Sequence, residues 1–122
     1  MSDPRNVYRD EILEHFRHPQ NFGTLHAFDK SSKQHNPLCG DEIEMYIKFH
    51  GDHIYEVRFT GKGCAISISS ASILTEYVKE KEKKHVSKLT DEEMLTLLGV
   101  EVSHGRKKCA LLGLYVLRDC LN

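Results

Sequence analysis

Three of the four cysteines in this 122-residue chain lie where a thiol can do chemistry. Cys39 lies in the loop "NPLCGDE", which leads into a predicted strand, and Cys64 and Cys109 each lie at the start of a predicted helix. Free amide groups and the helix dipole at a helix start favour the thiolate, which is the form that binds metal or attacks sulfur. Asp41 follows Cys39 by two residues and offers a carboxylate oxygen to the same site. These four side chains form the candidate site, which the fold must assemble.

Glycines lie beside two of these thiols. Gly40 follows Cys39, and Gly61 and Gly63 precede Cys64. Because glycine has no Cβ, a ligand can approach the backbone closely at these positions. The cysteine spacing contains no CxxC pair, so the sequence does not indicate a zinc ribbon or a zinc finger.

The alternative for any single cysteine is a small buried packing residue. We interpret Cys120 in this way, because it lies far beyond Cys109 in the same predicted helix. At 1.5 Å per residue the two thiols are about 16 Å apart along the helix axis, which is too far for both to bind one ion.

Histidines offer a competing set of metal ligands, since the chain contains eight of them. Most are interpreted as surface residues. His35 and His104 lie near Cys39 and Cys109 in the sequence, and each remains a candidate exchangeable ligand or hydrogen-bond partner of a ligand. The sequence alone does not decide between these roles.

The first half of the chain predicts one helix and one hairpin. The segment "DPRNVYRDEILEHFRHPQNFG" predicts an amphipathic helix with Asp3 as its N-cap and Pro4 at its first position. Residues 24–38 show no periodicity and are expected to form a loop. The segments "EIEMYIKF" and "IYEVRFT" alternate between apolar and polar residues, which predicts a hairpin with one buried face. That face comprises Ile43, Met45, Ile47 and Phe49 on the first strand and Tyr55, Val57 and Phe59 on the second.

The second half predicts helices. From Cys64 onward the apolar residues follow a helical period, and the Ser and Ala residues among them permit close packing against the sheet. The charged segment "EYVKEKEKKHVSK" is expected to be a solvated helix end and linker. A short helix follows, with Thr90 and Glu93 as a capping box and Gly99 as C-cap, and "CALLGLYVLRDCLN" predicts a core helix. The prediction is therefore an α+β fold in one domain, residues 1–122, with a small antiparallel sheet packed on one face by several helices.

Composition and charge exclude several classes of function. The formal net charge is −1, from 17 Lys and Arg against 18 Asp and Glu, so no overall field favours binding to nucleic acid or to an anionic membrane. The first residues carry acids and no apolar signal-peptide core, and no stretch approaches the roughly 20 apolar residues of a membrane span. We expect a soluble cytoplasmic protein whose cysteines are reduced.

Three ordered motifs resemble the U-type iron–sulfur cluster assembly scaffolds, the family of IscU, SufU and the amino-terminal domain of NifU. "NPLCGDEIEMYIKF" is similar to the family's first cysteine motif, "FTGKGCAISISSASILTEYVKEK" to its second and "GRKKCALL" to its third, while "VYRDEILEHFRHPQNFGTL" is similar to its first helix. The resemblance implies the family's α+β fold and a ligand set of Cys39, Asp41, Cys64 and Cys109. Cys120 matches nothing in that set.

Two departures favour a short SufU-like member. IscU-type members have a histidine immediately before the third cysteine, where this chain has Lys108, and an ammonium group has no lone pair to give a metal. IscU-type members also carry a Leu-Pro-Pro-Val-Lys segment that binds a dedicated chaperone, where this chain has "LGVEVSHGRKK". Binding of that chaperone is therefore not expected. The interval from Cys64 to Cys109 leaves little room for the insertion that SufU proteins usually contain.

The resemblance implies two related functions that use the same four ligands. In a SufU-like protein the site holds Zn²⁺, and a cysteine accepts persulfide sulfur from a cysteine desulfurase. Resemblance to SufU assigns that role to Cys39, with Asp41 as the labile ligand, and resemblance to IscU assigns it to Cys109. In a scaffold the same residues hold a [2Fe–2S] cluster that passes to recipient apo iron–sulfur proteins. A purely structural zinc site is the third alternative.

Overall fold

The computed structural model describes residues 4–38 and 40–122. Its elements in chain order are α1 (Pro4–Arg17), β1 (Lys30–Asn36), β2 (Asp41–His50), β3 (His53–Lys62), α2 (Ala65–Val78), α3 (Lys83–Ser87), α4 (Asp91–Leu98), the 3₁₀ helix η1 (His104–Arg106) and α5 (Lys107–Leu121). The three strands form one antiparallel sheet in the order β1-β2-β3. The predicted α+β class is confirmed.

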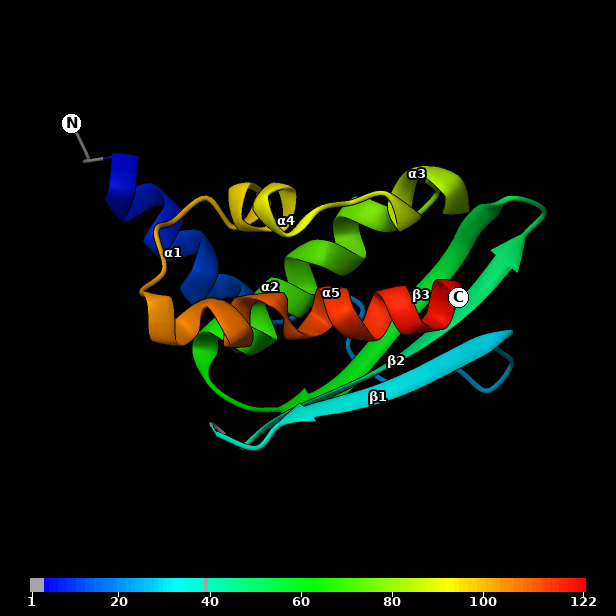
Figure 1. Ribbon diagram of the computed structural model, residues 1–122, viewed down its shortest axis with the longest axis horizontal. Coiled ribbons are helices and arrows are strands. Elements are labelled where there is room, and N and C mark those ends of the chain that lie inside the picture. The colour runs from blue at the N-terminus through cyan, green and yellow to red at the C-terminus, as the bar shows by residue number, and fades with distance from the viewer. Residues whose placement is uncertain (1–3, 39) are drawn as a thin grey trace.

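Helices cover one face of this sheet. The helices α2 and α5 lie directly on it, α2 against β3 and α5 against β1 and β2, while α1 packs on α2 and α4 packs on both central helices (Figure 1). The two central helices approach closely at Gly113 of α5, where an added Cβ would lie 3.3 Å from the Cα of Ala71. Ala71 of α2 therefore packs against α5. Ser72 of the same helix lies against the segment after α1, where its Oγ accepts from the Gln20 N–H at 2.8 Å. The sequence had predicted close packing of the small residues of α2 against the sheet, whereas these two contact other segments.

The alternation of β2 places three of its four predicted apolar side chains in the core, and the fourth, Phe49, is partly buried against it. Ile43, Met45 and Ile47 are fully buried, and Val57 and Phe59 of β3 join them from the neighbouring strand. The prediction was wrong for Tyr55, which is exposed, and Ile54 is buried in its place. The pairing register shifts there, since Lys48 pairs with Glu56 whereas Phe49 pairs with Ile54. An extra residue of this kind reverses which side chains face the core.

The predicted loop over residues 24–38 was wrong for Lys30–Asn36, which form β1. This strand lies at the edge of the sheet, and only its last residue, Asn36, is buried. Its sequence "KSSKQHN" lacks the apolar alternation that signals a strand. The segment is a strand nevertheless, because backbone pairing with β2 and polar contacts to α5 hold it in place. For example, the Gln34 amide donates to the carboxylate of Asp119 on α5.

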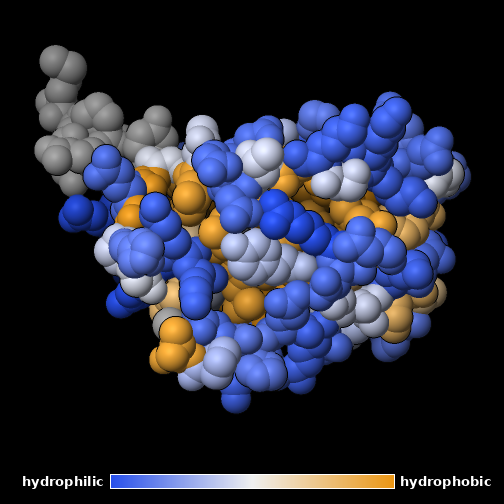
Figure 2. Space-filling model, viewed as in Figure 1, coloured by the Kyte–Doolittle hydropathy of each residue, from blue (hydrophilic) through white to orange (hydrophobic). Residues whose placement is uncertain are grey.

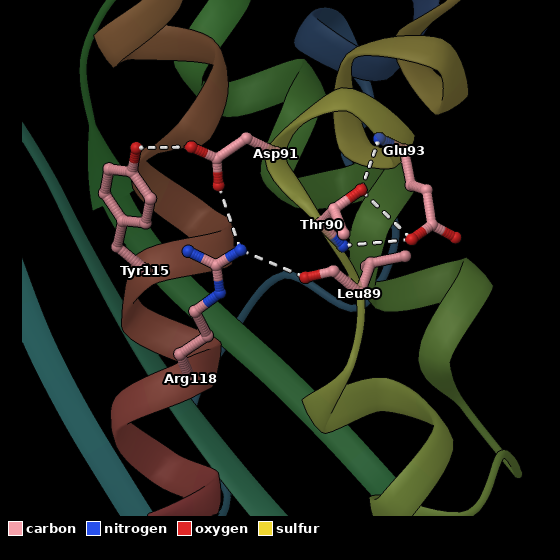
Figure 3. Close-up of polar contacts among 6 residues, drawn as sticks. All are labelled: Leu89, Thr90, Asp91, Glu93, Tyr115 and Arg118. Atoms are coloured by element: carbon pink, nitrogen blue, oxygen red, sulfur yellow. Dashed lines mark hydrogen bonds and ion pairs between the residues drawn. The ribbon is translucent and has the colours of Figure 1, made fainter.

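The charged segment after α2 contains a short helix, α3, rather than linker alone, and Val86 of that helix is buried. The predicted capping of the next helix is confirmed (Figure 3). The Thr90 hydroxyl accepts from the Glu93 backbone N–H at 3.1 Å, the Glu93 carboxylate accepts from the Thr90 N–H at 3.2 Å, and Gly99 ends α4 with φ 78°. Satisfied backbone groups at both ends fix the length of α4.

Helix α4 is tied to α5 by one carboxylate. Asp91 accepts from the Arg118 guanidinium at 2.9 Å and from the Tyr115 hydroxyl at 3.2 Å, and Arg118 also donates to the Leu89 carbonyl at 3.0 Å (Figure 3). Burial, followed by the nearby charge of Asp91, raises the pKa of Tyr115. These bonds hold the outer helix layer against the central one.

Cys120 packs in the main core, where it is buried between apolar residues of the sheet and helices. Burial raises the pKa of its thiol to about 11. The interpretation of Cys120 as a packing residue is confirmed.

The surface of the face shown in Figure 2 is mainly hydrophilic, with hydrophobic residues visible between the polar ones. Among the described residues, no helix is both long enough and apolar enough to span a membrane.

Candidate metal centre

Asp41, Cys64 and Cys109 come together at one end of the sheet. One ligand atom from each of them lies within 4.8 Å of the other two. Asp41 is the first residue of β2, Cys64 directly precedes α2 and Cys109 lies in the first turn of α5. All three positions lie at the end of the molecule where β3 leads into α2 and α5 begins (Figure 1). Cys39, the remaining predicted ligand, lies outside the described residues.

Asp41 reaches the centre through the turn between β1 and β2. The Gly40 N–H donates to the Asn36 carbonyl at 2.9 Å, and Gly40 has a φ of 72°, which glycine adopts without a steric penalty. The Asn36 amide oxygen accepts from the Leu38 N–H at 3.1 Å in the same turn. Asp41 lies on the same face of β2 as the buried Ile43, so its side chain points into the protein, and it is only 1% exposed.

Asp41 and Cys64 interact directly. The Cys64 backbone N–H donates to Oδ1 of Asp41 at 3.0 Å, and the Cys64 Sγ lies 3.9 Å from Oδ2. The backbone bond satisfies one amide at the start of α2 and holds Oδ1 of the carboxylate. A buried carboxylate with one oxygen held by the backbone and the other facing a thiol is preorganised as a ligand.

Gly63 makes room for this arrangement. A Cβ at residue 63 would strike Oδ1 of Asp41 and would lie 2.6 Å from Oγ of Ser67. Any side chain here would displace the carboxylate or the hydroxyl. The sequence predicted that this glycine removes bulk so that a ligand can approach the backbone; in the structure the groups that occupy this space are the side chains of Asp41 and Ser67. By contrast, a Cβ at Gly40 or Gly105 would meet nothing within 4 Å.

The three donors differ in their access to solvent. Asp41 and Cys109 are buried, whereas Cys64 is partly exposed. Lys108, next to Cys109, is exposed. Solvent therefore reaches this group of donors near Cys64, whereas Asp41 and Cys109 are shielded from it by the protein.

The donor set is chemically suited to a metal. Two thiols and a carboxylate are the ligand types that Zn²⁺ and iron–sulfur centres use, and close donors with limited solvent access match a structural or reactive zinc site. The three described donors supply three of the four ligands that a tetrahedral Zn²⁺ requires. These three donors fit a Zn²⁺ ion, which would need one further ligand.

The candidate histidines are not part of the described donor group. His35 lies at the end of β1, where it pairs with Glu42 of β2, and His104 begins η1. Both are exposed. Neither belongs to the cluster of Asp41, Cys64 and Cys109.

Sequence reasoning missed Ser67 as a neighbour of the centre. Ser67 is fully buried on α2, its hydroxyl donates to the Cys64 carbonyl at 3.1 Å, and its Oγ lies 3.8 Å from the Cys64 Sγ. The signal was its position three residues after Cys64, which places it on the helix face above that residue. Several other serines lie close to it in the sequence, so composition alone did not single out Ser67.

The sequence of this chain is similar to those of proteins that act in iron–sulfur cluster assembly or sulfur transfer, as their names state. The chain is 33% identical over 93 residues to the iron–sulfur cluster assembly scaffold protein IscU 1 of Archaeoglobus fulgidus, which covers 76% of this chain and 61% of the relative. It is 38% identical over 76 residues to the zinc-dependent sulfurtransferase SufU of Bacillus subtilis, which covers 62% of this chain and 51% of the relative. The chain thus spans between half and two thirds of the length of these relatives.

A solved structure has the same fold. It is named as an iron–sulfur cluster assembly scaffold protein for the SUF system, FiSufU, from Fervidobacterium islandicum AW-1. Its TM-score is 0.83 at 26% identity, with 97% of this chain and 98% of the other covered. Residues 7–122 match the family described as the NifU-like N terminal domain. This chain therefore belongs to the family of NifU-like N-terminal domains.

Proposed function

We propose that this protein takes part in iron–sulfur cluster assembly by accepting persulfide sulfur from a cysteine desulfurase at a metal site of Cys39, Asp41, Cys64 and Cys109. The observation that carries the proposal is the cluster of three of these donors within 4.8 Å. The relative named as a zinc-dependent sulfurtransferase supports zinc at that site. The proposed unit is a single domain, residues 1–122, acting in the cytoplasm, where thiols stay reduced.

The four proposed ligands would have different roles in the site. A bound Zn²⁺ would supply Lewis acidity that keeps the cysteines as thiolates near neutral pH. Cys64 and Cys109 anchor the site from the starts of two helices. Asp41 is the ligand proposed to exchange, because its oxygen is harder than the thiolates and a softer donor from the partner can replace it. Its second oxygen stays on the Cys64 N–H, so exchange would not release the side chain from the protein.

The sulfur transfer is a thiolate–disulfide type of exchange. The thiolate of Cys39, or of Cys109 as the alternative acceptor, attacks the outer sulfur of the desulfurase persulfide. The sulfur–sulfur bond of that persulfide breaks, and the desulfurase cysteine leaves as a thiolate. The outer sulfur then remains on this protein as a new persulfide, for delivery to a downstream acceptor.

A direct test measures desulfurase turnover with and without this protein, with the zinc and iron contents determined on the same sample. Stimulated turnover with tightly bound zinc is the expected result. The Asp41→Ala variant should retain less metal and should accept less sulfur, while Cys120→Ala serves as a thiol-deletion control that leaves both unchanged. Full sulfur acceptance by Asp41→Ala with metal still bound would contradict the role of the carboxylate.

The second candidate function is a scaffold on which a [2Fe–2S] cluster is assembled as cargo and passed to apo-proteins. It is favoured by the named scaffold relative that matches 76% of this chain. A brown chromophore on anaerobically purified protein, transferable to an apo-acceptor, would favour this function over zinc-dependent transfer. A purely structural zinc site would instead make every ligand substitution unfold the domain with no specific activity to lose.

A further inference from the structure

We propose that Ser67 is a positioning residue of the metal centre, which fixes Cys64 relative to Asp41 and tunes the Cys64 sulfur through its hydroxyl group. The inference rests on the proposed function, because it assigns a role at the same site. It concerns a residue that is not itself a ligand.

The Ser67 hydroxyl is placed to act on both ends of Cys64. It donates to the Cys64 carbonyl at 3.1 Å, and its Oγ is 3.8 Å from the Cys64 Sγ. The carbonyl bond fixes the backbone of the residue that precedes α2, while the Cys64 N–H is fixed by Asp41 at 3.0 Å. Cys64 is thereby held from both sides of its backbone.

Ser67 and Asp41 are the two groups within hydrogen-bond range that the Cys64 thiol faces among the described residues. Metal binding removes the thiol proton, so the sulfur then changes from a donor into an acceptor. A carboxylate cannot donate to it. The Ser67 hydroxyl can, by turning its single proton from the Cys64 carbonyl to the sulfur. Hydrogen bonds to a ligating sulfur are a known means by which proteins tune metal–thiolate centres.

The packing around Ser67 distinguishes its hydroxyl from those of the other serines on α2. Ser67 is fully buried, and the same Oγ would lie 2.6 Å from a Cβ at Gly63, next to the Asp41 carboxylate. The hydroxyl therefore fills the space between the helix start and the carboxylate. Ser70, on the same helix, provides the contrast, since its buried hydroxyl has no hydrogen-bond partner among the described residues.

The test compares Ser67→Ala with Ser70→Ala in the full chain, using Co²⁺ and Zn²⁺ as probes under anaerobic conditions. The measurements are the Co²⁺ dissociation constant, Zn²⁺ competition and the position of the thiolate-to-cobalt charge-transfer band. Loss of a hydrogen-bond partner of a metal ligand typically costs 10–100-fold in affinity. We expect Ser67→Ala to weaken Co²⁺ binding by at least about tenfold and to shift the band, and Ser70→Ala to match the wild type.

Ser67→Thr keeps the hydroxyl and should restore the band position even if its added methyl group lowers stability. Circular dichroism on each metal-free variant establishes that it is folded. Wild-type affinity and an unshifted band in Ser67→Ala would overturn the inference, as would equal losses in both alanine variants, because these would indicate a general effect on the helix. If the wild type itself bound neither ion, the metal centre and the proposed function would fail together with the inference.

Discussion

At the scale of single residues, the geometry of the candidate metal centre depends on a glycine as much as on the proposed ligands. Gly63 has no chemistry of its own, yet a Cβ there would meet both the Asp41 carboxylate and the Ser67 hydroxyl. Asp41, Cys64 and Cys109 could be named from the sequence as candidate ligands, because thiols at helix starts have a recognisable chemistry, and the structure brings the three side chains together. The contact between Cys64 and Asp41 could not, because it depends on how β2 and α2, 23 residues apart at this point, come together in the fold.

The substitution Gly63→Ala tests this dependence. The added methyl group should displace Asp41 or Ser67, weaken metal binding by at least about tenfold and cost about 1–3 kcal/mol of stability through overpacking. Gly105→Ala is the matched control, since a Cβ there meets nothing within 4 Å. Metal titration and chemical denaturation of both variants give the comparison. Equal metal affinity in the two would show that the space at residue 63 is not needed.

At the scale of elements, prediction succeeded where local chemistry determines the structure. The capping box and the terminal glycine of α4 were predicted because each uses neighbouring residues. The edge strand β1 was missed because pairing with β2 and contacts to α5, both distant in sequence, hold a polar segment in place. The prediction of which β3 side chains face the core was partly wrong. One shift in the pairing register near Glu56 places Ile54, rather than Tyr55, on the buried face.

The capping of α4 gives a prediction at this scale. Thr90→Ala removes the hydroxyl that accepts from the Glu93 N–H, and loss of such a cap costs about 1 kcal/mol. Metal affinity should not change, because none of the described candidate ligands lies on α4. Thr96→Ala, which alters an exposed helix-interior threonine of α4, is the control and should change stability by less than about 0.5 kcal/mol. Urea denaturation measures both, and an unchanged midpoint for Thr90→Ala would contradict the capping role.

At the scale of the whole molecule, the core contains a thiol that titrates out of its ordinary range. Burial raises the pKa of Cys120 to about 11 from the model-compound value of 9.0. In the unfolded chain this thiol loses its proton at lower pH than in the folded one, so the unfolded state binds fewer protons between these two values. Its contribution to stability is therefore present below pH 9 and is lost as the pH rises towards about 11.

Thermal unfolding of the metal-free protein from pH 8 to pH 11 checks this prediction. The wild type should lose up to about 3 kcal/mol more than Cys120→Ala over that range, since one pKa unit corresponds to about 1.4 kcal/mol. Tyr46 and Tyr115 also have raised pKa values and contribute to both proteins alike. Parallel pH profiles for the two proteins would contradict the assignment to Cys120.

The wide separation of the proposed ligands along the chain has one more consequence. Asp41 and Cys64 are 23 residues apart, and the second interval runs from residue 64 to residue 109. An ion bound by all three would close two loops at once, and a covalent cross-link over a loop of such length restricts the unfolded ensemble by roughly 3–5 kcal/mol. The bound ion would thus act as a removable cross-link between the sheet and both central helices. Giving it up would leave a looser chain, which proteases cleave more readily than the loaded form.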